Sequence, residues 1–179
     1  MMARNWDEYY RIAENLDFTP APLLVEVADL LPPGDALDLA CGHGRNALYL
    51  ARVGWKVTAV DSSRVALGLL GQRAAGLPIE AVGADLERHE FVIAPSAYDL
   101  VCDFFYLQRD LFPALRQGVR PGGVFAGAIH LFDESHPSAF AIHPGELRAA
   151  FDGWKILYYS EGAEAGHRRR AARILARNS

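Results

Sequence analysis

Glycines and aspartates near the start of the chain have types and spacing that suit the binding of a nucleoside. Gly42 and Gly44 follow an apolar run and open a helical pattern, so the backbone there can turn tightly and present its N–H groups to a ligand. Asp61 ends the next apolar run, 19 residues after Gly42. A carboxylate in that place can accept hydrogen bonds from both hydroxyls of a ribose. The spacing therefore predicts a nucleoside cofactor across the ends of two neighbouring strands.

Two classes of cofactor fit this spacing. Gly42, Gly44 and Ala47 match the G-x-G-x-x-A fingerprint of nicotinamide dinucleotide enzymes, which leaves an NAD(P)-dependent reductase as an alternative. Asp38 favours S-adenosylmethionine, because a carboxylate just before the glycines would face the amino-acid end of a cationic cofactor and repel a pyrophosphate. A non-catalytic domain that only binds S-adenosylmethionine is a further alternative.

The elements that must position these residues alternate between strand and helix. Two short helices are expected first, over 5–15 and 21–31, in a helical preface that spans residues 1–34. Strands are then expected over 36–41, 56–61, 79–85, 98–105 and 124–132, and helices over 47–54, 62–76, 110–119 and 144–151. Such strand-helix-strand units pair in parallel, so the pattern predicts an α/β fold with a mostly parallel sheet.

The last part of the chain breaks this alternation. Pro121-Gly122-Gly123 is expected to turn the chain into the strand over 124–132. The β-like runs 154–162 and 168–178 have no helical segment between them. Because strands close in sequence pair antiparallel, these runs predict a C-terminal hairpin.

Composition limits the classes of function. The 179 residues, with 51% hydrophobic and 22% charged residues, predict a single soluble domain over 1–179. The net charge of −4 gives no basic field for a nucleic acid, and no apolar stretch is long enough for a membrane span, so we expect a cytoplasmic protein with a small-molecule partner. Cys41 and Cys102 are expected to be buried thiols in a reducing compartment, and no metal site is expected. A monomer or weak homodimer is predicted.

The motif Asp38-x-Ala40-x-Gly42-x-Gly44 resembles the D-x-G-x-G-x-G motif of class I S-adenosylmethionine-dependent methyltransferases, with Ala40 in place of the first glycine. The resemblance implies a Rossmann-like, doubly wound sheet of seven strands in the order 3-2-1-4-5-7-6, with an antiparallel C-terminal hairpin. It also implies that Asp61 binds the ribose and that Asp85, in Gly83-Ala84-Asp85-Leu86, binds the adenine amino group. Arg120-Pro121-Gly122-Gly123 resembles the loop before the fifth strand of that family.

A narrower resemblance covers nearly the whole chain. Gly44-Arg45-Asn46 with Leu48-Tyr49-Leu50-Ala51, Gly145-Glu146-Leu147-Arg148, Gly153-Trp154 and Leu175-Ala176-Arg177 are similar to segments of the tellurite-resistance methyltransferases. The start, Trp6-Asp7-Glu8-Tyr9-Tyr10-Arg11, resembles the W-D-x-x-Y start of related small-molecule methyltransferases, in which that helix closes over the cofactor. The segment between the last two strands departs from the family, because it is shortened to about 161–166 before His167-Arg168. The shortening puts tellurite or selenite as substrate in doubt.

The predicted function is transfer of a methyl group from S-adenosylmethionine to a small-molecule acceptor, such as an oxyanion or a thiol, with S-adenosylhomocysteine as the product. The residues expected to contact the cofactor are Trp6, Tyr10, Asp38, Ala40, Cys41, Gly42, Gly44, Asn46, Asp61, Ser62, Ala84, Asp85, Leu86 and Phe104. Those expected to contact the acceptor or act in catalysis are Tyr106, Arg109, His130, His167 and Arg168.

Structural alternatives to the catalytic roles stay open. His130 could cap the end of a strand, and Tyr106 could serve packing alone. The run 167–170 could be an exposed strand edge kept soluble by charge. His43, His136 and His143 are expected to be loop side chains. A general base is needed only if the acceptor is an alcohol or an amine.

Overall fold

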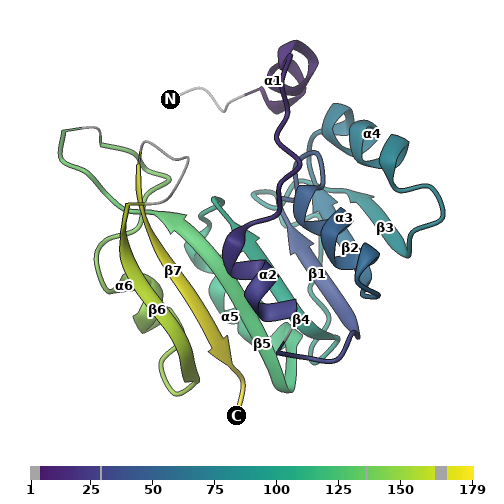
Figure 1. Cartoon of the computed structure of the whole chain (residues 1–179). Helices are drawn as coiled ribbons and strands as arrows, with labels where there is room; N and C mark the ends of the chain where they lie inside the picture. Colours follow the sequence, from purple (N-terminus) through teal and green to yellow (C-terminus); the bar gives the residue numbers. More distant parts are fainter. Residues whose placement is uncertain (1–4, 29, 136, 164–168) are drawn as a thin grey trace. The chain divides into compact units, whose positions relative to one another are not determined.

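The computed structural model describes residues 5–28, 30–135, 137–163 and 169–179 (Figure 1). Its contacts divide the chain into two compact units, with the boundary in the sequence between Val92 and Ile93. Among the described residues, the strands follow the order β3-β2-β1-β4-β5-β7-β6. This order and the antiparallel pairing of β6 with β7 confirm the predicted α/β fold class. The assignment of the chain to a single domain stays a prediction.

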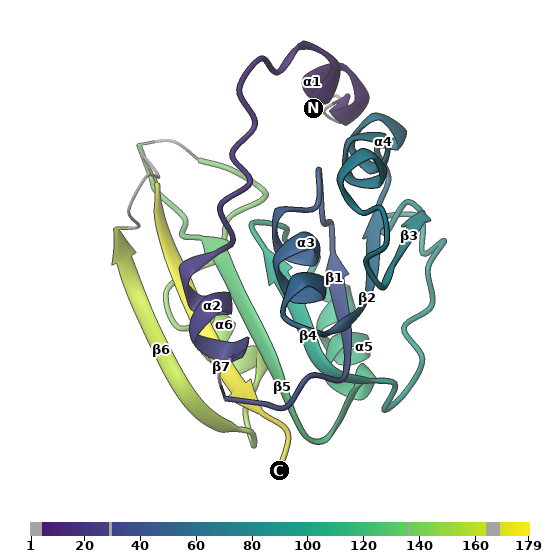
Figure 2. The same cartoon turned by 45° about the vertical axis from the view of Figure 1, so that its right-hand side comes forward.

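The first unit carries the glycine bend. Its elements are α1 (Trp6–Ile12), α2 (Pro22–Ala28), β1 (Asp35–Leu39), α3 (Arg45–Arg52), β2 (Lys56–Asp61), α4 (Arg64–Arg73) and β3 (Ile79–Gly83). β1, β2 and β3 pair in parallel, with Leu39 opposite Val60 and Asp61 opposite Gly83. Figure 2 shows α3 and α4 beside these strands. The carboxyl ends of β1 and β2 therefore open on the same edge of the sheet.

Apolar strand residues explain why this part of the sheet is buried. Leu37, Val57 and Val60 are at most 1% exposed, and Trp55, which leads into β2, is fully buried. Burial of such side chains stabilises the folded state by about 1.5–3 kcal/mol each. β1 and β2 are thus rigid supports for the residues at their ends.

The second unit holds the other four strands described by the structure. Its elements are β4 (Tyr98–Phe104), the 3-10 helix η1 (Arg109–Leu111), α5 (Phe112–Gly118), β5 (Val119–His130), α6 (Glu146–Ala150), β6 (Lys155–Ala163) and β7 (Arg170–Arg177). β4 and β5 are parallel, whereas β7 runs antiparallel to both β5 and β6. Pro113 lies in the first turn of α5, where its missing N–H leaves no helical bond unmade.

The predicted start of the fifth strand was wrong. β5 begins at Val119 rather than at residue 124, and its pairing with β4 jumps from Tyr98–Val119 to Leu100–Val124. The residues between form a bulge, because Gly122 adopts a left-handed φ of 82° and its N–H donates to the Asn178 carbonyl. The proline-glycine signal marks a bulge inside a strand, and not a turn before it.

Arg170, at the start of the last strand, is also placed differently from one expectation. β7 lies between β5 and β6, and Arg170 pairs with Ala163 of β6 while its carbonyl accepts from Leu131. Arg170 is therefore not on a strand edge. Cys41 and Cys102 are buried thiols, as predicted. No helix within the described ranges has the length and apolarity needed to cross a membrane.

Candidate functional site

Asp61 ends β2 with its carboxylate fixed by the backbone. The Gly42 N–H donates to Oδ2 and the Ser63 N–H donates to Oδ1, each over 2.8 Å. The residue is 8% exposed, and burial raises the pKa of its carboxyl although these N–H groups oppose the rise. Each oxygen keeps lone-pair capacity for a second donor. The carboxylate is thus held in one orientation and can still accept hydrogen bonds from a ligand.

The glycine bend between β1 and α3 needs left-handed backbone. Gly42 and Gly44 have φ values of 57° and 82°, which side chains with a β-carbon rarely adopt. A β-carbon on Gly42 would collide with the hydroxyl of Tyr10, and one on Gly44 would collide with Leu70. Ala40 stands before them with φ 46°, although it carries a β-carbon. Both glycines of the sequence motif are therefore required by conformation and by space.

Asp38 lies inside β1 and is 1% exposed. Burial raises the pKa of its carboxyl to about 7, with the Ala47 backbone N–H opposing the rise and the Asp61 charge adding to it. Its Oδ2 has no hydrogen-bond partner among the described residues. A buried carboxylate oxygen without a donor costs stability, and a cationic ligand above the bend would supply the missing partner.

A hollow of about 220 Å³ lies at the carboxyl ends of β2 and β3. It is lined by Ser62, Arg64, Gly83, Ala84, Asp85, Arg88 and Glu90. Asp85 Oδ1 accepts from the Glu87 N–H, and the Asp85 N–H donates to Glu90. The hollow begins at Ser62, the residue after Asp61.

The N-terminal segment covers the glycine bend. Asp7 accepts from the Ser63 hydroxyl at 2.7 Å and from the Val65 N–H at 3.2 Å. The Ser63 hydroxyl pulls the pKa of the Asp7 carboxyl down. His43, between the two glycines, is bonded through Nε2 to the Asp17 carbonyl at 2.8 Å. The preface is thus tied to Ser63, two residues after Asp61, and to the bend.

Other predicted cofactor residues of the first unit differ in what they contact. Asn46 is buried, and its side-chain oxygen accepts from the Ala21 N–H at 2.9 Å, which fastens the start of α2. Cys41 is buried, and burial raises the pKa of its thiol. Leu86 is 5% exposed beside the hollow lined by Ala84 and Asp85. Their contact with a cofactor stays a prediction.

In the second unit, the predicted acceptor residues follow the ends of β4 and β5. Phe105 has a left-handed φ of 68° and its ring lies 4.8 Å from that of His130, tilted by 32°. Strained backbone of this kind is held in place at ligand sites more often than elsewhere. The Tyr106 hydroxyl donates to Gln108 at 2.6 Å. Phe104, predicted to touch the cofactor, is half-buried at the end of β4.

The guanidinium of Arg109 is hydrogen-bonded to other residues of the second unit. Its Nε and Nη2 donate to the two carboxylate oxygens of Glu146 at 2.5 and 3.0 Å, and Nη2 also donates to the Ala141 carbonyl. Glu146 accepts from the His143 N–H as well. This pair joins the segment 141–146 to the 3-10 helix η1. His167 and Arg168, the other predicted catalytic pair, lie outside the described residues, as does His136.

Sequence reasoning missed several residues that shape these regions. Arg64, Arg88 and Glu90 line the hollow beside Asp85, and Asp7 with Ser63 joins α1 to α4. The hydrogen bond between Asp7 and Ser63 joins residues 56 positions apart, so no local sequence pattern predicts it. Asp7 does fall within the Trp6–Arg11 segment that carries a family resemblance, which was the available signal.

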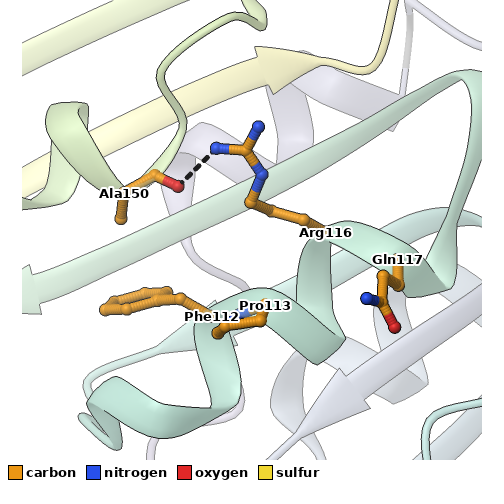
Figure 3. A pocket seen from close by; sticks show the side chains of 5 residues that line it. All are labelled: Phe112, Pro113, Arg116, Gln117 and Ala150. Atoms are coloured by element: carbon orange, nitrogen blue, oxygen red, sulfur yellow. Dashed lines mark hydrogen bonds between the residues drawn. The ribbon is translucent and has the colours of Figure 1, made fainter.

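A second hollow, of about 390 Å³, lies in the second unit away from the strand ends (Figure 3). It is lined by Phe112, Pro113, Arg116, Gln117 and Ala150. Arg116 donates to the carbonyls of Ala150 and Asp152, both at 2.8 Å, so it caps the end of α6. The described residues include no cluster of three or more His, Cys, Asp or Glu side chains able to hold a metal.

Comparisons with known proteins agree with this geometry. A model of the family described as "Tellurite resistance protein TehB" matches residues 2–175. A protein named "Hemagglutinin 1" from Eikenella corrodens is 31% identical over 158 residues, covering 79% of this chain and 51% of that protein. A "Probable S-adenosyl-L-methionine-dependent methyltransferase TehB" from Haemophilus influenzae is 26% identical over 161 residues, covering 81% and 54%.

The fold is matched by a solved structure as well. The crystal structure of TehB from Haemophilus influenzae has a TM-score of 0.78 at 22% identity, covering 97% of this chain and 67% of that one. The chain spans about half the length of the curated relatives it matches. It belongs to the TehB family, which confirms the resemblance found in the sequence and gives it the fold of S-adenosylmethionine-dependent methyltransferases.

Proposed function

We propose that this chain is an S-adenosylmethionine-dependent methyltransferase that holds its cofactor on the first unit. The observation that carries the proposal is the Asp61 carboxylate, which two backbone N–H groups orient at the edge of the glycine bend. A carboxylate at the end of the second strand, held in one orientation, suits the two hydroxyls of a ribose. The family and the fold support this assignment.

The residues around Asp61 fit an adenosyl sulfonium. The hollow beside Asp85 takes the base, and Asp38 offers a buried carboxylate oxygen without a donor to the cationic amino-acid end. Asp38, just before the glycines, would repel a pyrophosphate, which argues against a dinucleotide. The same carboxylate attracts the positive charges of S-adenosylmethionine.

The bound cofactor supplies a methyl group on a positively charged sulfur, which a nucleophile attacks in line. The protein's main task is then to orient the acceptor and exclude water. We propose that His130 and Tyr106 contact the acceptor, because His130 is the last residue of β5 and Tyr106 follows the carboxyl end of β4. Arg109 acts as a positioning residue, since Glu146 and Ala141 engage its guanidinium. His130 accepts a proton only where the acceptor is an alcohol or an amine.

The acceptor is proposed to be a small molecule such as an oxyanion or a thiol. The family description names tellurite resistance, which supports an oxyanion. The shortened segment before His167 and the neutralised guanidinium of Arg109 weigh toward a less charged acceptor. The net charge of −4 supports the absence of a nucleic-acid partner. The cytoplasmic location predicted from the sequence is part of this proposal.

Isothermal titration with S-adenosylhomocysteine tests the cofactor assignment. We expect micromolar binding by the wild-type chain and a loss of about 100-fold or more in Asp61→Ala, because two hydrogen bonds to a charged group contribute about 1.5–3 kcal/mol each. Glu80→Gln, an exposed acid on β3, is the matched control and keeps wild-type affinity. Preferential binding of NADH would move the chain to the oxidoreductases.

Methyl transfer needs a separate test. Labelled S-adenosylmethionine is incubated with the chain and a panel of tellurite, selenite, thiols and aromatic acceptors, and methylated products are counted. Label on one of these classes identifies the acceptor chemistry. Intact cofactor binding with no product across the whole panel would favour the non-catalytic alternative.

A further inference from the structure

Aromatic rings gather over the glycine bend of the first unit. The cluster consists of Trp6, Tyr9 and Tyr10 of α1 together with Phe18 and His43. Tyr9 and Tyr10 meet edge to face at 5.1 Å, and His43 meets Phe18 edge to face at 4.6 Å and Tyr10 at 5.9 Å. We refer to these residues as the aromatic cluster.

Tyr10 brings the aromatic cluster into contact with the bend itself. Its hydroxyl lies where a β-carbon of Gly42 would stand, and the residue is half-buried. Asp7, one turn earlier on α1, fixes the helix through Ser63 and Val65. Because Ser63 also donates its N–H to Asp61, the same residue links the α1 helix to the ribose acid. The ring of Tyr10 is thus held above the site rather than in solution.

The surroundings of Tyr10 favour a positive charge. Burial, followed by the charge of Asp61, raises the pKa of the Tyr10 hydroxyl, so the phenol stays neutral. Burial lowers the pKa of His43, so its imidazole is neutral at physiological pH and adds no repulsion. Asp38 and Asp61 lie beneath the bend as buried acids. Neutral aromatic rings beside two buried acids form an environment that attracts a cation.

A cation already sits on one ring of the aromatic cluster. The guanidinium carbon of Arg73 lies 4.1 Å from the centre of the Phe18 ring. Arg73 is the last residue of α4. Phe18 thus already accepts a positive charge on one face.

We propose that the aromatic cluster, chiefly Tyr10, distinguishes the charged methyl donor from its uncharged-sulfur product. This inference rests on the proposed function. Transfer breaks the bond between the methyl carbon and sulfur, the electron pair returns to sulfur, and the acceptor gains the methyl group. The sulfur loses its positive charge in that step, so its attraction to a π face disappears. Tyr10 therefore binds S-adenosylmethionine in preference to S-adenosylhomocysteine and favours release of the product.

Binding measurements on both ligands test the proposal. Titration gives the dissociation constants of S-adenosylmethionine and S-adenosylhomocysteine, and the wild-type chain is expected to bind the former about 5- to 30-fold more tightly. Tyr10→Leu weakens S-adenosylmethionine by about that factor and changes S-adenosylhomocysteine by less than about twofold. Ile12→Ala, a control on the exposed side of α1, leaves both constants unchanged.

A graded series keeps the test independent of helix packing. Tyr10→Phe is followed by phenylalanines with one to three ring fluorines at the same position, which keep the shape and withdraw π density. Affinity for S-adenosylmethionine should fall with each fluorine, whereas affinity for S-adenosylhomocysteine stays level. Equal changes for both ligands overturn the inference and leave the proposed function standing. Failure of the wild-type chain to bind either ligand instead refutes the proposed function.

Discussion

The two compact units hold their charged groups in different ways. In the first unit, Asp38 and Asp61 are 1% and 8% exposed, and the Asp61 carboxylate is held by backbone N–H groups. In the second unit, the side chains of Arg109 and Glu146 are 47% and 29% exposed and hold each other. Backbone donors on rigid strand ends fix a group before any ligand arrives. An exposed pair of long side chains can rearrange at little cost.

On the proposed function, this difference separates a preorganised cofactor side from an adaptable acceptor side. The cofactor of a methyltransferase is constant, so buried acids that match its charges can be fixed into the fold. Acceptors differ between relatives, and exposed residues after β4 and β5 can change without disturbing the strands that carry them. Free energies of unfolding and of ligand binding test this contrast.

The largest effect is expected from the pH dependence of stability at Asp38. Its pKa is about 7 when folded, against a usual value of 3.8. Between pH 3.8 and about pH 7, Asp38 holds a proton in the folded chain that it has lost in the unfolded chain. Asp38 therefore makes the free energy of unfolding fall as pH rises. The loss is about 1.4 kcal/mol per pH unit up to about pH 7 and is complete above it. From pH 5 to pH 8 the loss is about 3 kcal/mol.

Urea unfolding of the wild-type chain and Asp38→Asn at pH 5 and pH 8 measures this contribution. The difference between the two proteins should shift by about 3 kcal/mol in favour of the variant as pH rises. Glu80→Gln is the control, since that acid is exposed on β3. A shift near zero would mean that Asp38 is ionised at both pH values, and the contrast between buried and exposed charges would fail.

Cofactor affinity should show the opposite pH trend. Asp38 faces the charges of Asp61 and Arg45 and the Cys41 thiol, and a bound cation favours its ionised form. Below about pH 7, S-adenosylhomocysteine must displace a proton from Asp38. Its dissociation constant therefore rises by up to tenfold for each unit by which the pH is lowered. Titrations at pH 6, 7 and 8 check this. Asp38→Asn should bind weakly with no such slope; an equal slope in the variant assigns the proton elsewhere.

The Arg109–Glu146 pair should contribute much less. Its side chains are partly in water, so a double-mutant cycle with Arg109→Met and Glu146→Gln should give a coupling of about 0.5–1 kcal/mol. Addition of 0.5 M salt should reduce it. The Arg120–Asp99 pair, also 2.5 Å apart, provides a matched cycle in the same unit. A coupling above about 2 kcal/mol that salt does not change would mean that Arg109 is held as firmly as the buried acids of the first unit.

The sequence predicted what local pattern controls. The strand over 56–61 was predicted residue for residue, because an apolar run ends there in Asp61 before a helix cap. The role of Asp61 as a fixed carboxylate follows from its place after that run. The glycine bend was found for the same reason, since only glycine tolerates its left-handed backbone at low cost.

What the sequence could not show depends on contacts between distant residues. Asp7 and Ser63 are 56 residues apart, His43 and Asp17 are 26 apart, and Arg109 and Glu146 are 37 apart. No periodicity signals such pairs. The bulge at Gly122 was mistaken for a turn, because proline and glycine mark both and only the pairing of β4 with β5 tells them apart.

The smallest expected effect concerns strained backbone, which both units contain. Ala40 in the first unit and Phe105 in the second have φ values of 46° and 68°. A residue with a β-carbon in this region costs about 1–2 kcal/mol, while glycine costs about 0.4–1 kcal/mol through the unfolded chain. Ala40→Gly should therefore raise the free energy of unfolding by about 0.5 kcal/mol in urea titration.

Phe105→Gly supplies the contrasting case, because relief of the same strain there also removes a ring that contacts His130. Loss of a half-buried aromatic side chain costs more than the strain returns, so this variant should be less stable than the wild-type chain. A gain in stability in Ala40→Gly would mean that the β-carbon of Ala40 makes no contact that offsets its backbone strain. If Ala40→Gly instead destabilises the chain, the β-carbon of Ala40 contributes packing that outweighs its backbone cost, and the bend is supported by more than its two glycines.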